Sequence, residues 1–264
     1  MKICFGIPSW LPDKEPNRSL RKERINRLFK QLNDLWPEVD ILVIAQNWKE
    51  FKPIETTNKQ IIKKYPELGI LKARKVLREE FLKLNYDYII MFDDDAIIKC
   101  STNYANLDFI AEIEKHPQGF CFIHGGYNKY HPYIGAQLNL CAISRFIYER
   151  EPMVDIDPQK KEGFEDSIYA CLLHHKWGKY EFEPPTTIRP IQFNNSKEKA
   201  PSTWHDEARK TGGLLVMREN TSKLQKYISE HKDLPKNYRE MLIISKSTVT
   251  KTADGRRTNC YLYF

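Results

Sequence analysis

The chain has 264 residues, 41% of them hydrophobic and 29% charged, so it can bury a core without disulfide staples, which argues against extensive disorder. Its longest apolar runs are far shorter than the roughly 20 residues that span a bilayer, and no charged-then-apolar leader opens it. These features disfavour an integral membrane protein and a secreted protein with a signal peptide. The six cysteines are far apart and form no C-x-x-C pair, which predicts a reducing, cytoplasmic location.

The net charge of +7 is concentrated at the end of the chain. Residues 199–264 hold 13 lysines and arginines against 7 aspartates and glutamates, an excess of six positive charges. Such a stretch suits an anionic partner, either a membrane surface or nucleic acid. The alternative is a solvated basic face with no partner.

Apolar strands and amphipathic helices alternate over the first 92 residues. Three short apolar runs are typical of buried strands: residues 1–9, 40–45 and 88–92. Helical periodicity covers residues 20–36 and 56–84, and the second stretch is interrupted at Pro66 and Gly69 before a helix over 70–84. This order predicts a mostly parallel α/β sheet flanked by helices, with ligands bound beyond the carboxyl ends of the strands.

The pattern is less regular after residue 97. The expected helices are residues 107–115, 164–177, 221–231 and 237–244, and the expected strands are residues 120–124 and 134–144. The absence of internal repeats favours one catalytic domain over residues 1–215, made of a nucleotide-sugar-binding half (1–97) and an acceptor and catalytic half (98–215). Residues 216–264 are then a basic extension.

Three carboxylates, Asp93, Asp94 and Asp95, follow the third apolar strand directly. Adjacent carboxylates repel one another unless a cation or solvent screens them. Because alternate residues of an extended segment point to one side, Asp93 and Asp95 are expected to converge on one divalent metal while Asp94 turns away. Ligation by oxygen suits Mg²⁺ or Mn²⁺. The alternative is a solvated acidic turn.

This region resembles family 2 glycosyltransferases and related GT-A enzymes. A Gly-x-x-x-Ala-Arg segment at Gly69, Ala73 and Arg74 precedes a strand that ends in an Asp-x-Asp motif at Asp93 and Asp95. The resemblance implies a Rossmann-like GT-A fold, in which Asp93 contacts the donor ribose or base and Asp95 holds the metal that bridges the nucleotide diphosphate. The implied donor contacts are Pro8, Ser9, Trp10, Gln46, Asn47, Arg74, Asp93 and Asp94, with Trp10 stacking on the base.

A second motif, Glu165-Asp166, is similar to the Glu-Asp pair that opens the acceptor-side helix of these enzymes. By this resemblance Asp166 is the general base that takes the proton of the acceptor hydroxyl, and Glu165 is the alternative base. Such a pair is also ordinary chemistry for capping a helix. The late histidine of many GT-A enzymes, which completes the metal shell or contacts the diphosphate, corresponds by position to His205, against the alternative of a surface histidine.

The chain departs from the family pattern after the second strand. Gln46 and Asn47 stand where family 2 members commonly have an aspartate that reads the base, and an amide can hydrogen-bond a uracil edge. UDP is therefore the expected nucleotide, although this substitution leaves the identity of the base open. The Gln-x-x-Arg-Trp segment of processive polysaccharide synthases is missing, which favours a single-addition enzyme.

The sequence therefore predicts an inverting, Mn²⁺- or Mg²⁺-dependent glycosyltransferase that uses a nucleoside-diphosphate sugar. Its expected acceptor is a hydroxyl of a cell-surface glycan or a lipid-linked oligosaccharide, with peripheral association at the anionic inner membrane face. A hydroxylated base in DNA, as in phage-type modification enzymes, suits the basic tail equally. This sequence lacks the motifs of nucleotidyltransferases and of phosphohydrolases, which disfavours both classes. The non-enzyme alternative is a nucleic-acid-binding protein with a degenerate site.

Overall fold

The computed structural model describes residues 1–96, 98, 113–115, 117, 119–123, 136–153, 169, 181–182, 250–251 and 257–258. The chain divides into two compact units, Met1–Ser202 and Thr203–Phe264. The domain boundaries after residues 97 and 215 stay predictions. Among the residues described, no helix has both the length and the apolar character needed to cross a membrane.

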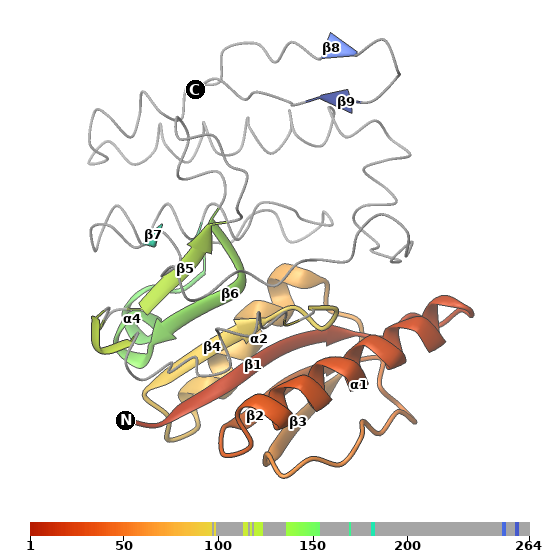
Figure 1. Cartoon of the computed structure of the whole chain (residues 1–264), viewed down its shortest axis with the longest axis horizontal. Helices are drawn as coiled ribbons and strands as arrows, with labels where there is room; N and C mark the ends of the chain where they lie inside the picture. The colour runs from red at the N-terminus through yellow and green to blue at the C-terminus, as the bar shows by residue number, and fades with distance from the viewer. Residues whose placement is uncertain are drawn as a thin grey trace. The chain divides into compact units, whose positions relative to one another are not determined.

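Seven described strands of the first unit form one sheet in the order β3-β2-β1-β4-β6-β5-β7 (Figure 1). They are β1 (Ile3–Trp10), β2 (Asp40–Gln46), β3 (Gln60–Tyr65), β4 (Tyr88–Phe92), β5 (Gly119–Ile123), β6 (Ala136–Ser144) and β7 (Glu181–Phe182). The pairs along β3-β2-β1-β4 are parallel, whereas β6 runs antiparallel to both β4 and β5. The second unit contains an antiparallel pair, β8 (Thr250–Lys251) and β9 (Arg257–Thr258).

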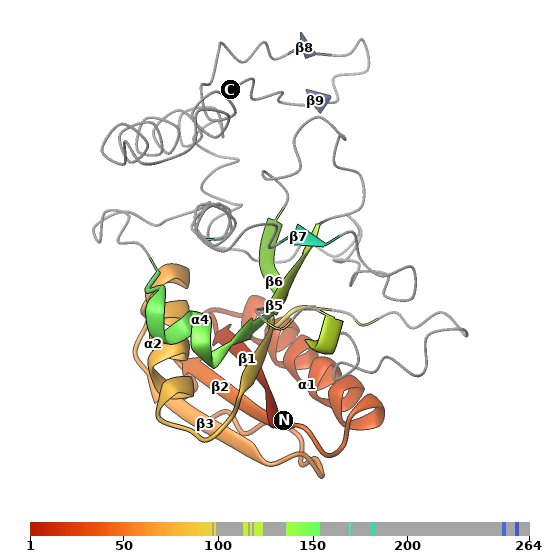
Figure 2. The same cartoon turned by 90° about the vertical axis from the view of Figure 1, so that its left-hand side faces the viewer.

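Helices cover both faces of this sheet. Figure 2 shows α1 (Asn17–Leu35) on one face and α2 (Ile70–Leu82) with α4 (Arg145–Arg150) on the other. The apolar stripe of α1 is fully buried at Ile25, Leu28, Phe29 and Leu32, so its burial stabilises the helix against the sheet. The predicted α/β architecture with a mostly parallel sheet is confirmed.

On the face of the sheet that α2 covers, β1 has a glycine, Gly6, where a side chain would not fit. A Cβ atom at Gly6 would lie 2.4 Å from Cδ1 of Ile89 on β4 and 3.2 Å from Cδ2 of Leu77 on α2. Those distances are closer than ordinary packing allows, so glycine lets α2 and β4 approach β1 directly. Cys4 in β1 and Cys141 in β6 are buried as well.

One predicted element is wrong: residues 56–65 are not the first part of a helix, because Gln60–Tyr65 forms strand β3. β3 pairs with β2 from Ile41 opposite Gln60 to Gln46 opposite Tyr65. Within the described part of the chain it has one neighbour in the sheet, and it is half-buried, so lysines and isoleucines mix along it without strict alternation. That mixture resembles the stripe of an amphipathic helix.

The other predicted elements are confirmed where the structure describes them. The strands over 1–9, 40–45, 88–92, 120–124 and 134–144 correspond to β1, β2, β4, β5 and β6, and the helices over 20–36 and 70–84 correspond to α1 and α2. Of the helix predicted over 107–115, residues 113–115 are described and helical; of the one over 164–177, only Tyr169 is described. The elements expected over 221–231 and 237–244 lie outside the described residues.

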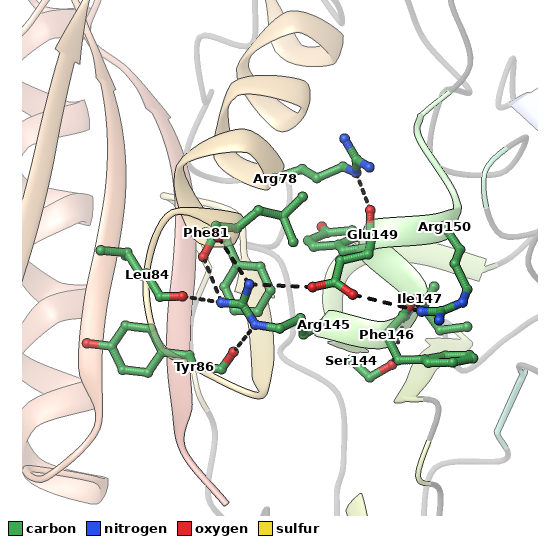
Figure 3. A network of polar contacts seen from close by, with 12 residues as sticks. Arg78, Phe81, Leu84, Tyr86, Ser144, Arg145, Phe146, Ile147, Glu149 and Arg150 are labelled. Atoms are coloured by element: carbon green, nitrogen blue, oxygen red, sulfur yellow. Dashed lines mark hydrogen bonds and ion pairs between the residues drawn. The ribbon is translucent and has the colours of Figure 1, made fainter.

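Arg145, the first residue of α4, ties the end of α2 to the start of β4 (Figure 3). Its guanidinium donates hydrogen bonds to main-chain carbonyl oxygens of Leu82 (3.1 Å), Tyr86 (2.8 Å) and Leu84, and it lies 5.2 Å from the ring centroid of Phe81. The last carbonyl groups of a helix have no partner within the helix, and a cation is favoured near them. Arg145 thus fixes the turn that leads into β4.

Replacing Arg145 with glutamine is expected to lower the free energy of unfolding by about 2 kcal/mol, because several carbonyls lose a charged donor. Urea denaturation of the two proteins measures this loss. Arg150→Gln is the matched control, since Arg150 lies half-exposed on the same helix and stacks on the exposed ring of Phe146. A loss for Arg145→Gln no larger than for this control would contradict the assignment.

Candidate functional site

The carboxyl ends of β1 and β4 meet at the point where the strand order reverses. The chain builds β1, β2 and β3 outward in one direction and then returns to place β4 on the other side of β1. In open α/β sheets, such a switch point leaves a crevice beyond the strand ends in which ligands bind. The acidic segment Asp93–Asp95 starts there, directly after Phe92.

Asp94 is buried at a turn, Asp93–Ala96, and not in the extended segment that the sequence predicts; Nη1 of Arg21 lies close to both Asp94 and Asp95. Oδ2 of Asp94 accepts hydrogen bonds from the hydroxyl of Ser9 (2.7 Å) and the main-chain N–H of Trp10 (3.1 Å), while its Oδ1 lies 2.6 Å from Nη1 of Arg21 on α1. The Asp94 carboxylate therefore ties the end of β4 to the end of β1 and to α1. Burial raises the pKa of Asp94, and the positive charge of Arg21 opposes that rise.

Asp93 and Asp95 remain partly accessible, with side chains 29% and 23% exposed. Nη2 of Arg74 on α2 lies 3.3 Å from Oδ1 of Asp93. Oδ2 of Asp95 lies 3.2 Å from Nη1 of Arg21 and 3.9 Å from Nη1 of Arg24. Each of the three carboxylates therefore has a guanidinium from a neighbouring helix within ion-pair distance.

The three arginines are themselves buried, with side chains 8%, 3% and 5% exposed for Arg21, Arg24 and Arg74. Burial alone would lower the pKa of Arg21, but the nearby carboxylates of the acidic segment raise it. Buried cations require such partners because an unpaired charge in the interior costs several kcal/mol. The arginines thus supply within the chain the screening that three adjacent aspartates need.

The segment that follows the carboxylates is also held by α1. The side-chain amide of Gln31 donates to the main-chain carbonyl of Ile98 (2.8 Å), and its oxygen accepts from the main-chain N–H of Ile98 (3.1 Å). The N–H of Ala96 closes a tight turn onto the carbonyl of Asp93 (3.0 Å). The acidic turn is therefore fixed at both ends, by Arg21 at its start and by Gln31 after it.

Two of the predicted donor contacts at β1 have defined structural roles. Ser9 is fully buried, and its hydroxyl is used by Asp94. Trp10 is half-buried as the last residue of β1, with its main-chain N–H on the same carboxylate. Pro8 lies beside them in β1 and is also buried. Stacking of Trp10 on a base stays a prediction, as do donor contacts of the other two residues.

The predicted base-reading residues lie at the end of β2. Gln46 is buried, and its side-chain oxygen accepts a hydrogen bond from the main-chain N–H of Leu68 (2.8 Å). Asn47 has a φ angle of +61°, a conformation that asparagine tolerates better than most residues. The Gln46 hydrogen bond positions the turn that leads into α2. Gly69, the N-cap residue of α2, has a φ angle of +79°, which glycine adopts without strain. Contact of Gln46 or Asn47 with a base stays a prediction.

The remaining predicted site residues, Glu165, Asp166 and His205, lie outside the described residues. The structure therefore brings together Ser9, Trp10 and the acidic turn, and leaves the general base and the histidine as predictions. Within the described ranges, no three His, Cys, Asp or Glu side chains are grouped so that they could hold a metal ion.

Sequence reasoning missed Arg21, Arg24 and Gln31 as residues of this site. The signal was available: Arg21 and Arg24 are three apart and flank the buried stripe that contains Ile25 and Leu28. Residues three and four apart share a helix face, so these arginines had to be buried with their stripe or at its border. A buried cation implies a buried carboxylate, and the acidic triplet was the obvious partner.

Two partly exposed carboxylates at a strand end fit a divalent cation. Mg²⁺ and Mn²⁺ take hard oxygen ligands, and Mg²⁺ is commonly bound by one or two carboxylates together with substrate phosphates rather than by a complete protein cage. Asp93 and Asp95 can supply that pair of carboxylates, whereas Asp94 is turned inward onto Ser9 and Trp10.

No protein-family model matches the chain, and no curated protein matches it by sequence. Among solved structures, the chain is similar to a mannosyltransferase from Pyrobaculum calidifontis, solved in complex with GDP-Man and Mn²⁺. The two share 14% identity, with a TM-score of 0.55, over 91% of this chain and 68% of the other. It is also similar to mannosyl-3-phosphoglycerate synthase from Rubrobacter xylanophilus, at 10% identity and a TM-score of 0.50, over 97% and 85% of the two chains.

These similarities concern the fold. Both proteins have the GT-A-like architecture of nucleotide-sugar transferases, so the predicted fold class is confirmed. At such low identity the activity does not transfer with the fold, because one fold hosts many functions. The argument for function therefore depends on the residues at the switch point.

Proposed function

We propose that this chain is a glycosyltransferase that moves a sugar from a nucleoside-diphosphate donor to an acceptor hydroxyl. The observation that carries the proposal is the meeting of the carboxyl ends of β1 and β4, where Asp94 is bonded to Ser9 and Trp10 while Asp93 and Asp95 stay partly exposed. The GT-A-like fold supports it, since nucleotide-sugar transferases share this architecture.

In this proposal several described residues bind different parts of the donor. Asp95 and Asp93 would hold Mn²⁺ or Mg²⁺, and Asp93 would also contact the ribose. Arg74, anchored on α2 beside Asp93, neutralises part of the charge of the diphosphate. Trp10 lies beneath the base, and Asn47 reaches its edge.

The bound cation would supply charge neutralisation on the departing diphosphate. The acceptor hydroxyl loses its proton to Asp166, or to Glu165 in its place, and attacks the anomeric carbon from the side opposite the leaving group. This displacement inverts the anomeric configuration. Buried Arg21 holds the acidic turn in place through Asp94.

The acceptor is proposed to be a hydroxyl of a glycan or a lipid-linked oligosaccharide. The excess of six positive charges over residues 199–264 supports this choice. A basic segment gains about 1 kcal/mol per lysine or arginine near an anionic membrane surface. That gain suits an enzyme that acts on a membrane-attached substrate.

Asp95→Asn is expected to abolish the Mn²⁺-dependent part of nucleotide binding, because an amide cannot replace an anionic oxygen ligand. The measurement is a thermal-shift panel with UDP, GDP, CDP and TDP sugars, each with and without Mn²⁺, since a ligand that binds the native state raises its melting temperature. The same panel identifies the base.

The matched control is Asp34→Asn, which removes an exposed carboxylate of α1 paired with Lys30. This control should keep the full thermal shift with Mn²⁺ and the preferred sugar nucleotide. An Asp95→Asn protein that keeps it as well would contradict the assignment of Asp95 as a metal ligand. A native protein that no sugar nucleotide stabilises would contradict the proposed function.

A further inference from the structure

Tyr169 is a buried residue three positions after Asp166 in the chain. It is 1% exposed, its backbone is helical, and its hydroxyl donates a hydrogen bond to the main-chain carbonyl of Glu151 (2.8 Å). Three residues of fully extended chain span at most about 11 Å, so the Cα atoms of Asp166 and Tyr169 lie within that distance in any conformation. The contacts that hold Tyr169 therefore limit the position of the proposed general base.

The carbonyl that Tyr169 binds belongs to a helix end that is itself fixed. Glu151 is the C-cap residue of α4, is buried, and donates its main-chain N–H to the carbonyl of Ile147 (2.8 Å). At the other end of α4, the side chain of the N-cap residue Ser144 accepts a hydrogen bond from the main-chain N–H of Ile147 (3.2 Å). The last carbonyls of a helix have no partner within it, so a hydroxyl from another segment is a favourable donor there.

The same short helix is attached to the elements that carry the acidic turn and its arginine. Tyr148 is fully buried, and its hydroxyl donates to Sδ of Met91 on β4 (3.3 Å), two residues before Asp93. Nε of Arg78 on α2, one turn after Arg74, donates to the main-chain carbonyl of Tyr148 (2.6 Å). A shift of α4 would therefore disturb the strand that ends at Asp93 and the helix that carries Arg74.

Tyr148 and Tyr169 are neighbours in one buried cluster. Burial raises the pKa of Tyr148, and the nearby phenol of Tyr169 raises it further. The Tyr148 hydroxyl therefore stays a hydrogen-bond donor throughout the physiological pH range. A continuous set of contacts then leads from Asp93 through β4, Tyr148 and α4 to Tyr169.

We propose that Tyr169 is a positioning residue: its bond to Glu151 fixes the segment that carries Glu165 and Asp166 relative to the acidic turn. This inference rests on the proposed function, since it takes Asp166 as the general base. The base must face the anomeric carbon from the side opposite the diphosphate, and a misplacement of about 1 Å can lower a rate by about 10²-fold. A buried bond to main chain is suited to prevent such a misplacement.

The first test needs no activity. Tyr169→Phe keeps the ring and removes the hydroxyl, so peptides of the full-length protein that contain Glu165 and Asp166 should exchange their amide hydrogens about fivefold faster, the factor expected for one ordinary hydrogen bond. Hydrogen–deuterium exchange with mass spectrometry measures this rate. The matched control is Tyr88→Phe, which also removes a hydroxyl that donates to a main-chain carbonyl, that of Pro117, and should leave these peptides unchanged.

The second test is a double-mutant cycle on turnover. The assay is Mn²⁺-dependent release of nucleoside diphosphate from the preferred sugar nucleotide with water as acceptor: the water oxygen bonds to the anomeric carbon, its proton goes to the base, and the diphosphate leaves. Tyr169→Phe is expected to lower turnover about tenfold and to change KM for the donor by no more than about twofold. In an Asp166→Asn background it should cause no further loss, because the group that it positions no longer acts.

The outcomes separate the positioning role from the function on which it rests. Exchange in Tyr169→Phe no faster than in Tyr88→Phe would overturn the anchor. An equal loss of turnover from Tyr169→Phe with and without Asp166→Asn would show a general structural effect and would overturn the positioning role alone. Native protein that no sugar nucleotide stabilises would overturn the proposed function, while the exchange rates would still decide whether Tyr169 anchors its segment.

Discussion

Replacing Arg21 with methionine is expected to lower the free energy of unfolding by about 3–5 kcal/mol, the cost of leaving one partner of a buried ion pair unpaired. Asp94 would keep its bonds from Ser9 and Trp10 but lose the cation 2.6 Å away. Burial already raises the pKa of Asp94, so removal of Arg21 should raise it further. Asp94 would then be protonated more readily in the folded protein than in the unfolded chain.

Urea denaturation as a function of pH measures both effects. A carboxyl group whose pKa is raised in the folded state makes the protein less stable as pH rises from the unfolded pKa toward the folded one. Arg21→Met should therefore lose more stability at pH 7 than at pH 5, relative to the native protein. Adding Asp94→Asn to Arg21→Met should recover part of the loss, because residue 94 is then no longer a buried charge without its cation.

The control for Arg21→Met is Lys30→Met, which removes an exposed cation of the same helix and should change stability by about 0.5 kcal/mol or less. A loss below about 1 kcal/mol for Arg21→Met, independent of pH, would mean that the Arg21–Asp94 pair does not hold the acidic turn.

Asp166→Asn is expected to lower turnover by about 10²- to 10⁴-fold, the usual contribution of general base catalysis. The amide keeps the size of the side chain but cannot accept the proton of the acceptor hydroxyl. Binding of the sugar nucleotide with Mn²⁺ should remain within about twofold of the native value, because the base acts on the acceptor. Steady-state transfer assays together with a thermal-shift titration of the donor measure both quantities.

Glu165→Gln is the matched control, since it makes the same chemical change at the neighbouring position. It should reduce turnover much less than Asp166→Asn. A reversed order of the two variants would move the general base to Glu165, and full activity in both would remove the Glu-Asp motif from the mechanism.

Much of the first half of the fold could be predicted from the sequence. The apolar runs that became β1, β2 and β4 are buried on both faces, so their residues are uniformly apolar and easily recognised. β3 was missed because it is half-buried and, among the residues that the structure describes, pairs with β2 alone. Its pairing with β2 is a tertiary interaction that no local pattern encodes.

The candidate site was predictable in its location and less so in its contacts. The sequence places Asp93, Asp94 and Asp95 after a buried strand, and parallel topology brings that strand end beside Trp10. The partners of the carboxylates come from two helices, Arg74 at 19 residues from Asp93 and Arg21 at 73 residues from Asp94 in the chain. Spacing along a helix limits such pairs but does not select one, so they required the three-dimensional structure.

The two hydrogen bonds between the Gln31 side chain and the main chain of Ile98 have a consequence for which substitutions the protein tolerates. These bonds attach the acidic turn to a long, well-packed helix. The turn should therefore move with α1 and not as an independent loop. Substitutions on the solvent side of α1 should therefore change neither turnover nor stability. Substitutions in its buried stripe should lower turnover even where the loss of stability is small. The segment after Gln46 is tied to the same helix, because the main-chain N–H groups of Ile54 and Thr57 donate to Asn26 and Asn33 of α1, so α1 supports both sides of the strand ends.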